Sequence, residues 1–361
     1  MTQALHVAVL GASGIAGGEL CRLLLGHPDV ATITPVARTT GPLARAHPNL
    51  SGCTLELVDP EQLHARAGEF DVLFTSTPAG EAMRLVGAHH ARGTRIVDLS
   101  PDFRFADPAA YRRAYGEEHA SPELLADAVY GATEIYRDEL AKTRLVANPG
   151  CYAITALLAL APLLGPDLLD PAAPVSVHAV NGTTGAGSTP KADLMHARVD
   201  GSMLAYSLEG HRHGPELEQV LEGLGGRPVT VDFNTTHGDF PRGIHLQANV
   251  RLSAELSRDE LLELYLERYG RDHGGEYFVH VNTLPKSGKL NAKQYELYPR
   301  LGDVVGSNFC HLGIDRDEER GIVKIVAVTD NLVKGAAGSA IQNMNVMLGL
   351  DETAGLRAYA L

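Results

Sequence analysis

The sequence has little that would anchor it in a membrane. Its longest apolar stretch, 153–164, is interrupted by Pro162 and is too short to span a bilayer. Residues 1–6 show neither the basic segment nor the long apolar run of a secretory signal. We therefore expect no membrane association and a cytoplasmic location.

Cysteine and positive charge are also scarce. The four cysteines are scattered and form no C-x-x-C pair, which argues against a disulfide framework and suits a reducing compartment. Lysine and arginine number 31 against 44 acidic residues, so the net charge is -13. This balance argues against a nucleic-acid partner, and any anionic ligand needs a local group of cations.

The length of 361 residues and the 38 glycines are the positive compositional features. At roughly 150 residues per domain the length predicts two domains. A hydrophobic content of 44% is ordinary for a globular protein. The glycines fall at the ends of apolar runs, where tight turns and close backbone approach use them.

The first 150 residues alternate short β-branched runs with helical patterns, which is typical of a parallel sheet covered by helices. The expected strands are 6–10, 31–37, 71–75, 95–99 and 145–147. This half of the chain is predicted to be a Rossmann-type, doubly wound α/β domain.

After residue 150 the strand candidates become longer and alternate in polarity, which favours a mainly antiparallel sheet in an α+β domain. The expected strands are 174–180, 229–234, 243–252, 277–281 and 322–329. A capping box at 257–260 predicts a helix to Tyr269, and a last helix is expected at 336–348.

A glycine cluster at 11–18 follows the first strand and opens a helix. The backbone N–H groups at such a turn, with the positive end of the helix, suit a pyrophosphate. The spacing is G-x-x-G-x-x-G, however, and a tight strand-to-helix turn without a ligand is the competing interpretation.

The residues after the second strand favour NADP over NAD. An NAD site usually has an acidic residue on the ribose 2′-hydroxyl, but 30–55 contains none. Arg38, Thr39 and Thr40 stand there instead and suit a 2′-phosphate. The alternative is that Arg38 is an ordinary solvated arginine.

Cys151 is the candidate nucleophile. It follows Asn148-Pro149-Gly150 at the start of a predicted helix, where the helix dipole and free N–H groups lower the pKa of a thiol and hold an oxyanion. The other three cysteines are interpreted as small buried hydrophobes. A thiolate beside a nicotinamide indicates attack on an acyl carbon followed by hydride transfer.

The segment 210–216 offers an acid/base group. His211 could titrate near neutral pH, and Arg212 could bind a phosphate or carboxylate. A structural helix start is one alternative. A metal site formed with His213 is another, but no third ligand stands at a characteristic spacing, so no metal is expected.

Two further segments could bind anions. The loop 181–188, which contains Gly185, is followed by Lys191, and Arg104 stands after the strand at 95–99. An ordinary loop is the alternative for the first segment. An ion pair between Arg104 and Asp98 or Asp102 is the alternative for the second.

With these residues in view, the chain resembles the N-acetyl-gamma-glutamyl-phosphate reductase family, NADP-dependent enzymes of arginine biosynthesis that reduce an acyl phosphate to a semialdehyde. The motifs that carry the resemblance, in chain order, are G-A-S-G-I-A-G-G at 11–18, H-P-N-L at 47–50, D-L-S-P-D-F-R at 98–104, N-P-G-C-Y at 148–152, G-T-T-G-A-G at 182–187, G-H-R-H-G-P-E at 210–216 and D-N-L-V-K-G-A-A-G at 330–338.

The resemblance implies a role for each matching residue. Cys151 would be the nucleophile and His211 the acid/base, with His213 as the alternative. Cofactor binding would fall to Gly11, Ser13, Gly14, Ile15, Ala16, Arg38, Thr39 and Asn331. Beside these, we expect Arg104, Gly185, Lys191, Arg212 and Glu216 to bind the substrate.

It also implies an architecture. The NADP-binding domain would comprise 1–148 with 331–361 returning to it, and 149–330 would form the catalytic and dimerisation domain. The family forms dimers or tetramers, so a homo-oligomer is expected. The substrate would be a small acyl phosphate.

Some residues depart from the family pattern. G-T-T-G-A-G stands where G-V-S-G-A-G is usual, near the expected substrate pocket. The aminoadipyl-phosphate reductase of lysine biosynthesis, acting on a chain one methylene longer, therefore stays open as an alternative, as does dual use. Tyr152 after Cys151 favours the glutamyl substrate. Aspartate-semialdehyde dehydrogenase ranks third, and an NADP-binding sensor without catalysis is the alternative from another class.

Overall fold

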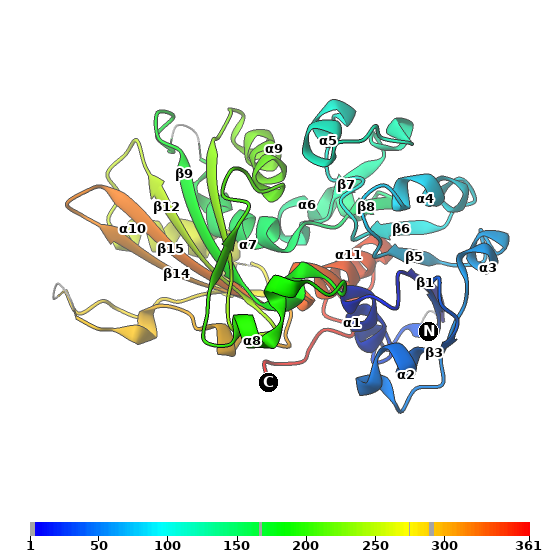
Figure 1. The fold of residues 1–361 in the computed structure, drawn as a ribbon. Helices are drawn as coiled ribbons and strands as arrows, with labels where there is room; N and C mark the ends of the chain where they lie inside the picture. Colours follow the sequence, from blue (N-terminus) through cyan, green and yellow to red (C-terminus); the bar gives the residue numbers. More distant parts are fainter. Residues whose placement is uncertain (1–3, 166–167, 274, 289–291) are drawn as a thin grey trace. The chain divides into compact units, whose positions relative to one another are not determined.

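The computed structural model describes residues 4–165, 168–273, 275–288 and 292–361. The chain forms two compact units (Figure 1). The first comprises Met1–Gly150, Ala186–Thr189 and Gly335–Ala358. The second comprises Cys151–Gly185, Pro190–Lys334 and Tyr359–Leu361. The return to the first unit thus begins at Gly335 rather than at Asn331.

The first unit is built on a parallel sheet with the strand order β2-β1-β5-β6-β8-β7. The strands are β1 Leu5–Leu10, β2 Val30–Val36, β5 Val72–Thr75, β6 Arg95–Asp98, β7 Ala128–Tyr130 and β8 Leu145–Ala147. A two-residue ribbon pairs β3 Gly41–Pro42 with β4 Glu56–Leu57. The predicted doubly wound parallel sheet is confirmed. Strand β7 was not predicted, because it is three residues long and only half-buried.

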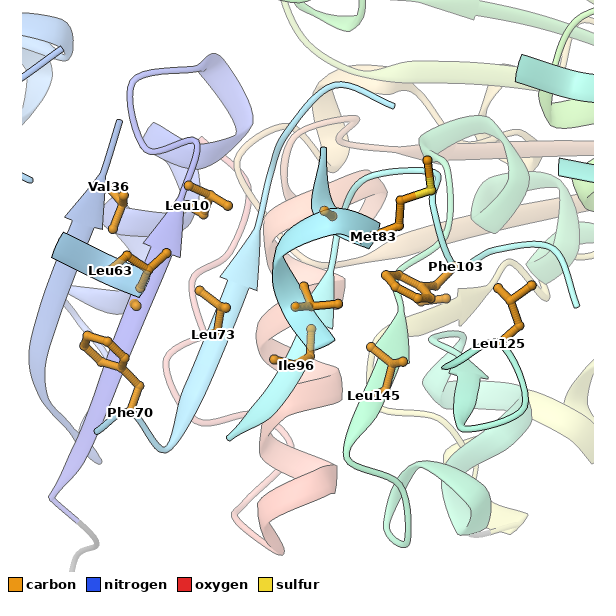
Figure 2. Packing of buried hydrophobic residues seen from close by; sticks show 14 of the residues in the cluster. Leu10, Val36, Leu63, Phe70, Leu73, Met83, Ile96, Phe103, Leu125 and Leu145 are labelled. Carbon is orange, nitrogen blue, oxygen red and sulfur yellow. The ribbon is translucent and has the colours of Figure 1, made fainter. Parts of the chain in front are cut away.

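Helices surround this sheet. They are α1 Ile15–Leu24, α2 Leu43–Ala46, α3 Pro60–Ala65, α4 Ala82–Ala91, α5 Pro108–Tyr115, α6 Thr133–Leu140 and α11 Gly338–Leu348. Apolar side chains from the strands meet those of α3, α4 and the loop after β6 in one buried cluster, part of which Figure 2 shows. Because Leu73 and Ile96 in the centre of the cluster are fully buried, the sheet gives the unit a rigid base.

The last helix completes the first unit. Helix α11 packs against α1, α6 and β6, and its buried face carries amide side chains as well as apolar ones. Asn343 donates from Nδ2 to Gly131 O (2.7 Å) and to Asn148 Oδ1 (3.0 Å). Thr133 Oγ1 donates to Asn343 Oδ1 at 2.7 Å. The helix therefore fixes the residues that follow β7 and β8 through buried hydrogen bonds.

The second unit contains a mixed sheet with the order β10-β11-β9-β12-β15-β14-β13. Its strands are β9 Val175–Asn181, β10 Leu204–Tyr206, β11 Val231–His237, β12 Ile244–Arg251, β13 Val279–Val281, β14 Cys310–Asp317 and β15 Ile322–Thr329. Most neighbours pair antiparallel, as predicted, but β9 with β11 and β13 with β14 pair parallel.

Strand β14 was missed because its sequence mixes polar residues with a central glycine. At Gly313 a Cβ atom would lie 2.8 Å from Leu297 O, so the glycine permits another segment to pass close to the strand. Such a contact is not visible in the alternation of polarity along the strand.

Helices cover one face of this sheet. They are α7 Cys151–Leu160, α9 His213–Gly225 and α10 Arg258–Tyr269, and the short helix α8 His196–Val199 lies between β9 and β10 in the chain. Helix α7 packs on β12, β15 and α9, and α9 packs on β11. The predicted capping box of Ser257 and Glu260 is present at the start of α10. Tyr269 in the last turn of α10 donates to Leu158 O at 2.9 Å and so links α10 to α7.

Among the helices of the described residues, none combines the length and the apolar character that crossing a membrane requires.

Candidate functional site

The glycine turn of the first unit joins β1 to α1. Gly11 has φ +86°, a conformation that favours glycine, and a Cβ atom there would lie 2.2 Å from Ser76 O. A Cβ atom at Gly17 would lie 2.2 Å from Gly11 O. Because both contacts would be with backbone atoms, only glycine fits at positions 11 and 17.

The turn leaves the first N–H groups of α1 without a side-chain cap. Gly14 occupies the N-cap and offers no side-chain hydrogen bond, while Ser13 is exposed and Ile15 and Ala16 are half-buried. His47, from the H-P-N-L motif, lies with its Nε2 2.7 Å from Ala12 O and so holds the turn. An uncapped helix start behind a glycine turn fits the phosphates of a dinucleotide.

One residue at this edge of the sheet was missed by sequence reasoning. Thr77 follows β5, and its Oγ1 is buried without a hydrogen-bond partner among the described residues. The only sequence signal is a run of small hydroxyl residues, Thr75 to Thr77, directly after a buried strand. A buried hydroxyl of this kind suits a ligand bound at the carboxyl ends of the strands.

Arg38 lies just after β2, as predicted, with its side chain 78% exposed. Its Nη2 donates to Glu81 Oε1 at 2.7 Å. Thr39 beside it is also exposed. The pair with Glu81 is a surface ion pair and contributes little to stability, so the guanidinium can exchange that carboxylate for a phosphate at small cost.

Arg104 is buried, and its guanidinium binds the backbone. It is 8% exposed and donates to two backbone carbonyls, from Nε to Asn148 O (2.9 Å) and from Nη2 to Leu99 O (2.9 Å). Of the two carboxylates named as alternative partners, Asp98 binds Thr75 and Ser100, and Asp102 binds the backbone of Gly80. Arg104 thus secures the backbone three residues before Cys151.

Cys151 is the first residue of α7 and is half-buried. It has the position at the start of a helix that the sequence predicted. In contrast, Cys21 is fully buried, and burial raises the pKa of its thiol to about 12. Of these two cysteines, only Cys151 combines access with a helix start.

Aromatic and histidine rings surround the start of α7 within the second unit. The ring of Tyr152 lies 5.5 Å from that of His211 and 5.7 Å from that of Phe233. The hydroxyl groups of Tyr152 and Tyr206 lie 3.1 Å apart. Burial raises the pKa of Tyr206 to about 12, and the nearby Cys151 adds to this rise. The cluster therefore keeps neutral polar groups beside the thiol.

His211 differs from its prediction in one respect. Burial lowers its pKa to about 4, with contributions from Arg212 and His237, so it does not titrate near neutral pH in this chain. Its Nδ1 accepts a hydrogen bond from the backbone N–H of His213 at 3.2 Å. A neutral His211 therefore carries its proton on Nε2 and acts as a hydrogen-bond donor.

The other residues of this segment divide into buried and exposed groups. His213 and Glu216 are buried in the first turn of α9, with His213 Nε2 4.0 Å from Glu216 Oε2. Arg212 is exposed. Among the described residues no cluster of possible metal ligands involves this segment.

The predicted loop after β9 is held by hydrogen bonds rather than flexible. Asn331 accepts from Gly243 N at Oδ1 (2.7 Å) and donates from Nδ2 to Thr184 Oγ1 (3.0 Å). Gly185 gives the loop room, since a Cβ atom there would lie 2.1 Å from Asn181 Nδ2. Lys191 is exposed. Burial lowers the pKa of His237, and the nearby Lys191 lowers it further.

The lowered pKa of His211 predicts a loss of stability in acid. The unfolded state takes up the proton near pH 6.5 and the folded state only near pH 4, so stability falls as the pH drops through this interval. At pH 5 the free energy of unfolding should be lower than at pH 7 by about 2 kcal/mol on account of this residue. In His211→Asn the difference in the free energy of unfolding between pH 5 and pH 7 should be smaller by this amount, as measured by urea titration at both pH values. The exposed His178→Asn is the control, and an unchanged pH dependence in His211→Asn would contradict the prediction.

Two family matches cover most of the chain. Residues 6–143 match the semialdehyde dehydrogenase NAD binding domain, and residues 151–331 match the semialdehyde dehydrogenase dimerisation domain. The second match supports an oligomer. The boundary between the matches falls at the turn before Cys151.

Curated relatives match over nearly the full length. N-acetyl-gamma-glutamyl-phosphate reductase of Geobacter metallireducens is 42% identical, over 99% of both chains. That of Nitrosococcus oceani is 40% identical, again over 99% of both chains. A putative [LysW]-L-2-aminoadipate/[LysW]-L-glutamate phosphate reductase of Cenarchaeum symbiosum is 40% identical over 98% of both chains.

Solved structures share the fold at low identity. Aspartate semialdehyde dehydrogenase II of Vibrio cholerae has a TM-score of 0.69 at 14% identity, over 96% of this chain and 99% of that one. Aspartate semialdehyde dehydrogenase with NADP from Candida albicans has a TM-score of 0.65 at 16% identity, over 96% and 99% of the two chains. With the glycine turn and Cys151 in their places, the chain belongs to the semialdehyde dehydrogenases, a class of phosphorylating oxidoreductases with a nicotinamide-nucleotide-binding domain, and within it to the N-acetyl-gamma-glutamyl-phosphate reductase family.

Proposed function

We propose that this protein reduces N-acetyl-gamma-glutamyl phosphate to N-acetylglutamate semialdehyde and phosphate with NADPH. The observation that carries the proposal is the placement of Cys151, half-buried at the first residue of α7 and next to Tyr152, whose ring lies 5.5 Å from that of His211. The identity of 42% to a reductase of this name supports the choice of substrate.

The chemistry follows from the residues of the second unit. The Cys151 thiolate attacks the γ-carbonyl carbon, and phosphate departs with the electron pair of the carbon–oxygen bond, which leaves a thioester. The N–H groups at the start of α7 stabilise the negative oxygen formed in that attack. After hydride transfer to the thioester carbon, His211 donates a hydrogen bond from its Nε2–H to the negative oxygen. That oxygen then re-forms the carbonyl as the carbon–sulfur bond breaks, which gives the aldehyde and the Cys151 thiolate.

The glycine turn and Arg38 are the proposed cofactor site. Gly11, Gly14 and the first turn of α1 would bind the pyrophosphate, and Arg38 with Thr39 would bind the 2′-phosphate. When bound, NADPH supplies the hydride that reduces the thioester. The absence of acidic residues from 30–55 supports NADP over NAD.

Arg38→Ser should separate the two cofactors. The KM for NADPH should rise roughly 10- to 100-fold through loss of a charge-assisted bond to phosphate, and the KM for NADH should stay unchanged. Glu81→Gln is the matched control, because it removes the competing carboxylate 2.7 Å from Arg38 and should not raise the KM for NADPH. Equal increases for both cofactors in Arg38→Ser would show that the arginine does not bind the 2′-phosphate.

The aminoadipyl homologue is the second candidate substrate. The relative from Cenarchaeum symbiosum at 40% identity and the G-T-T-G-A-G loop favour it. One methylene is worth only about 1–3 kcal/mol of discrimination, so use of both substrates is compatible with one site.

An assay in the oxidative direction tests the proposal. Purified protein is given phosphate with NADP or NAD, and with either N-acetylglutamate semialdehyde or its aminoadipate homologue. We expect phosphate-dependent NADPH formation, with the higher kcat/KM for the glutamate compound. A preference for the longer semialdehyde would assign the second candidate. Cofactor binding without any turnover would favour a sensor.

A further inference from the structure

Asn181 and His237 lie side by side at the carboxyl ends of two strands of the second unit. Asn181 ends β9 and His237 ends β11, and the parallel register places them opposite each other. Residues paired in this way point to the same face of a sheet. That face also carries Phe233 of β11, whose ring lies 5.7 Å from that of Tyr152 in α7.

Both side chains are buried, and each has one buried polar atom without a hydrogen-bond partner among the described residues. Asn181 is 1% exposed and His237 is 7% exposed. Asn181 Oδ1 and His237 Nδ1 have no partner among the described residues. A buried polar group left unpaired destabilises the folded chain. Two neighbouring examples at strand ends therefore call for a ligand that supplies the missing partners.

The two residues adjoin the proposed catalytic cluster. The ring of His237 stacks on that of Tyr206, with centroids 4.3 Å apart and planes at 10°. Tyr206 in turn interacts with Cys151 and contacts the ring of His211 at 5.8 Å. A single small molecule bound by Asn181 and His237 can therefore extend to Cys151.

The chemistry of the pair selects a neutral ligand group. Asn181 offers a carboxamide, with one acceptor oxygen and one donor nitrogen. Burial and the nearby Lys191 lower the pKa of His237, so its imidazole is neutral and has one donor and one acceptor nitrogen. A secondary amide has one N–H and one C=O and matches such a pair. A free ammonium group would meet Lys191 at close range and be repelled.

We propose that Asn181 and His237 form the subsite that binds the acetylated α-nitrogen of the substrate, with Asn181 accepting the amide N–H and His237 donating to the acetyl oxygen. This inference rests on the proposed function and deepens it. It makes the two residues specificity determinants for an acylated over a free α-amine. Gly185 is part of the same subsite, because only a glycine leaves room for the Asn181 amide.

The test compares two semialdehydes in the oxidative assay with NADP and phosphate. N-acetylglutamate semialdehyde carries the amide, and 5-oxopentanoate has the same carbon chain without the nitrogen. In Asn181→Leu, kcat/KM for the first compound should fall roughly 10- to 100-fold, while that for the second stays within about threefold. His237→Phe retains the ring stacked on Tyr206 and should show the same selective loss. If Asn181→Leu does not fold, His237→Phe alone tests the proposal.

Asn249→Leu is the matched control. Asn249 is half-buried on β12, between the buried Ala248 and Val250, and so points to the other face of the sheet. It should leave both rates unchanged. Equal losses for both compounds in Asn181→Leu and His237→Phe, or an undiminished preference for the acetylated one, would overturn the inference. A wild-type protein that oxidises neither compound would overturn the proposed function itself.

Discussion

Cys151→Ser is expected to lower the rate of phosphate-dependent NADPH formation by at least about 10³-fold. A serine hydroxyl stays protonated near neutral pH, whereas a cysteine thiol is a far stronger acid and supplies the thiolate that the proposed reaction needs. The size and position of the side chain hardly change. The loss should therefore fall on kcat, and the affinity for NADP should be retained, as measured by calorimetry.

Alkylation gives an independent measurement of the same thiol. Iodoacetamide near neutral pH should modify Cys151 much faster than Cys21, which is buried and whose pKa is raised to about 12. Mass spectrometry of the peptides follows both sites in one sample. Retained turnover in Cys151→Ser, or equally slow labelling of the two cysteines, would exclude Cys151 as the nucleophile.

Gly17→Ala is expected to weaken the binding of NADP by roughly 100-fold, because a misplacement of about 1 Å costs that much at a precise site. The added methyl group would lie 2.2 Å from Gly11 O, so α1 has to move away from the turn that is proposed to bind the phosphates. We also expect a loss of about 1–3 kcal/mol in the free energy of unfolding, as for other overpacked sites.

Gly52→Ala is the control for this change. Gly52 lies in the same unit, has no atom within 4 Å of an added Cβ, and has an ordinary φ. Its NADP affinity and stability should match those of the wild type. Titration calorimetry and thermal unfolding report the two effects separately. Unaltered NADP affinity in Gly17→Ala would show that the turn does not bind the cofactor.

Features that depend on neighbours in the chain could be predicted from the sequence. The strands at 145–147 and 322–329 have the predicted bounds, because apolar β-branched runs between turns form strands in almost any context. The capping box at Ser257 needs only residues three apart. Cys151 at a helix start follows from the N-P-G turn and the unbroken helix formers behind it.

The candidate site could be predicted only in part. Its cysteine, glycine turn and histidine segment stand in recognisable local patterns. Arg104 remains a predicted substrate ligand, but its contacts with Asn148 O and Leu99 O could not be predicted, because these carbonyls face it only after β6 and β8 have paired. Asn181 and His237 were not singled out, because 55 residues separate them and their pairing depends on the strand register.

The sequence by itself therefore determined the parallel sheet of the first unit, the glycine turn before α1 and the cysteine at the start of α7. Each is encoded by periodicity or by residues within a few positions. Tertiary structure alone decided the backbone contacts of Arg104, the neutral state of His211 and the pairing of Asn181 with His237. The physical reason is that burial and desolvation are properties of the packed chain, which bring together groups that the order of residues keeps apart.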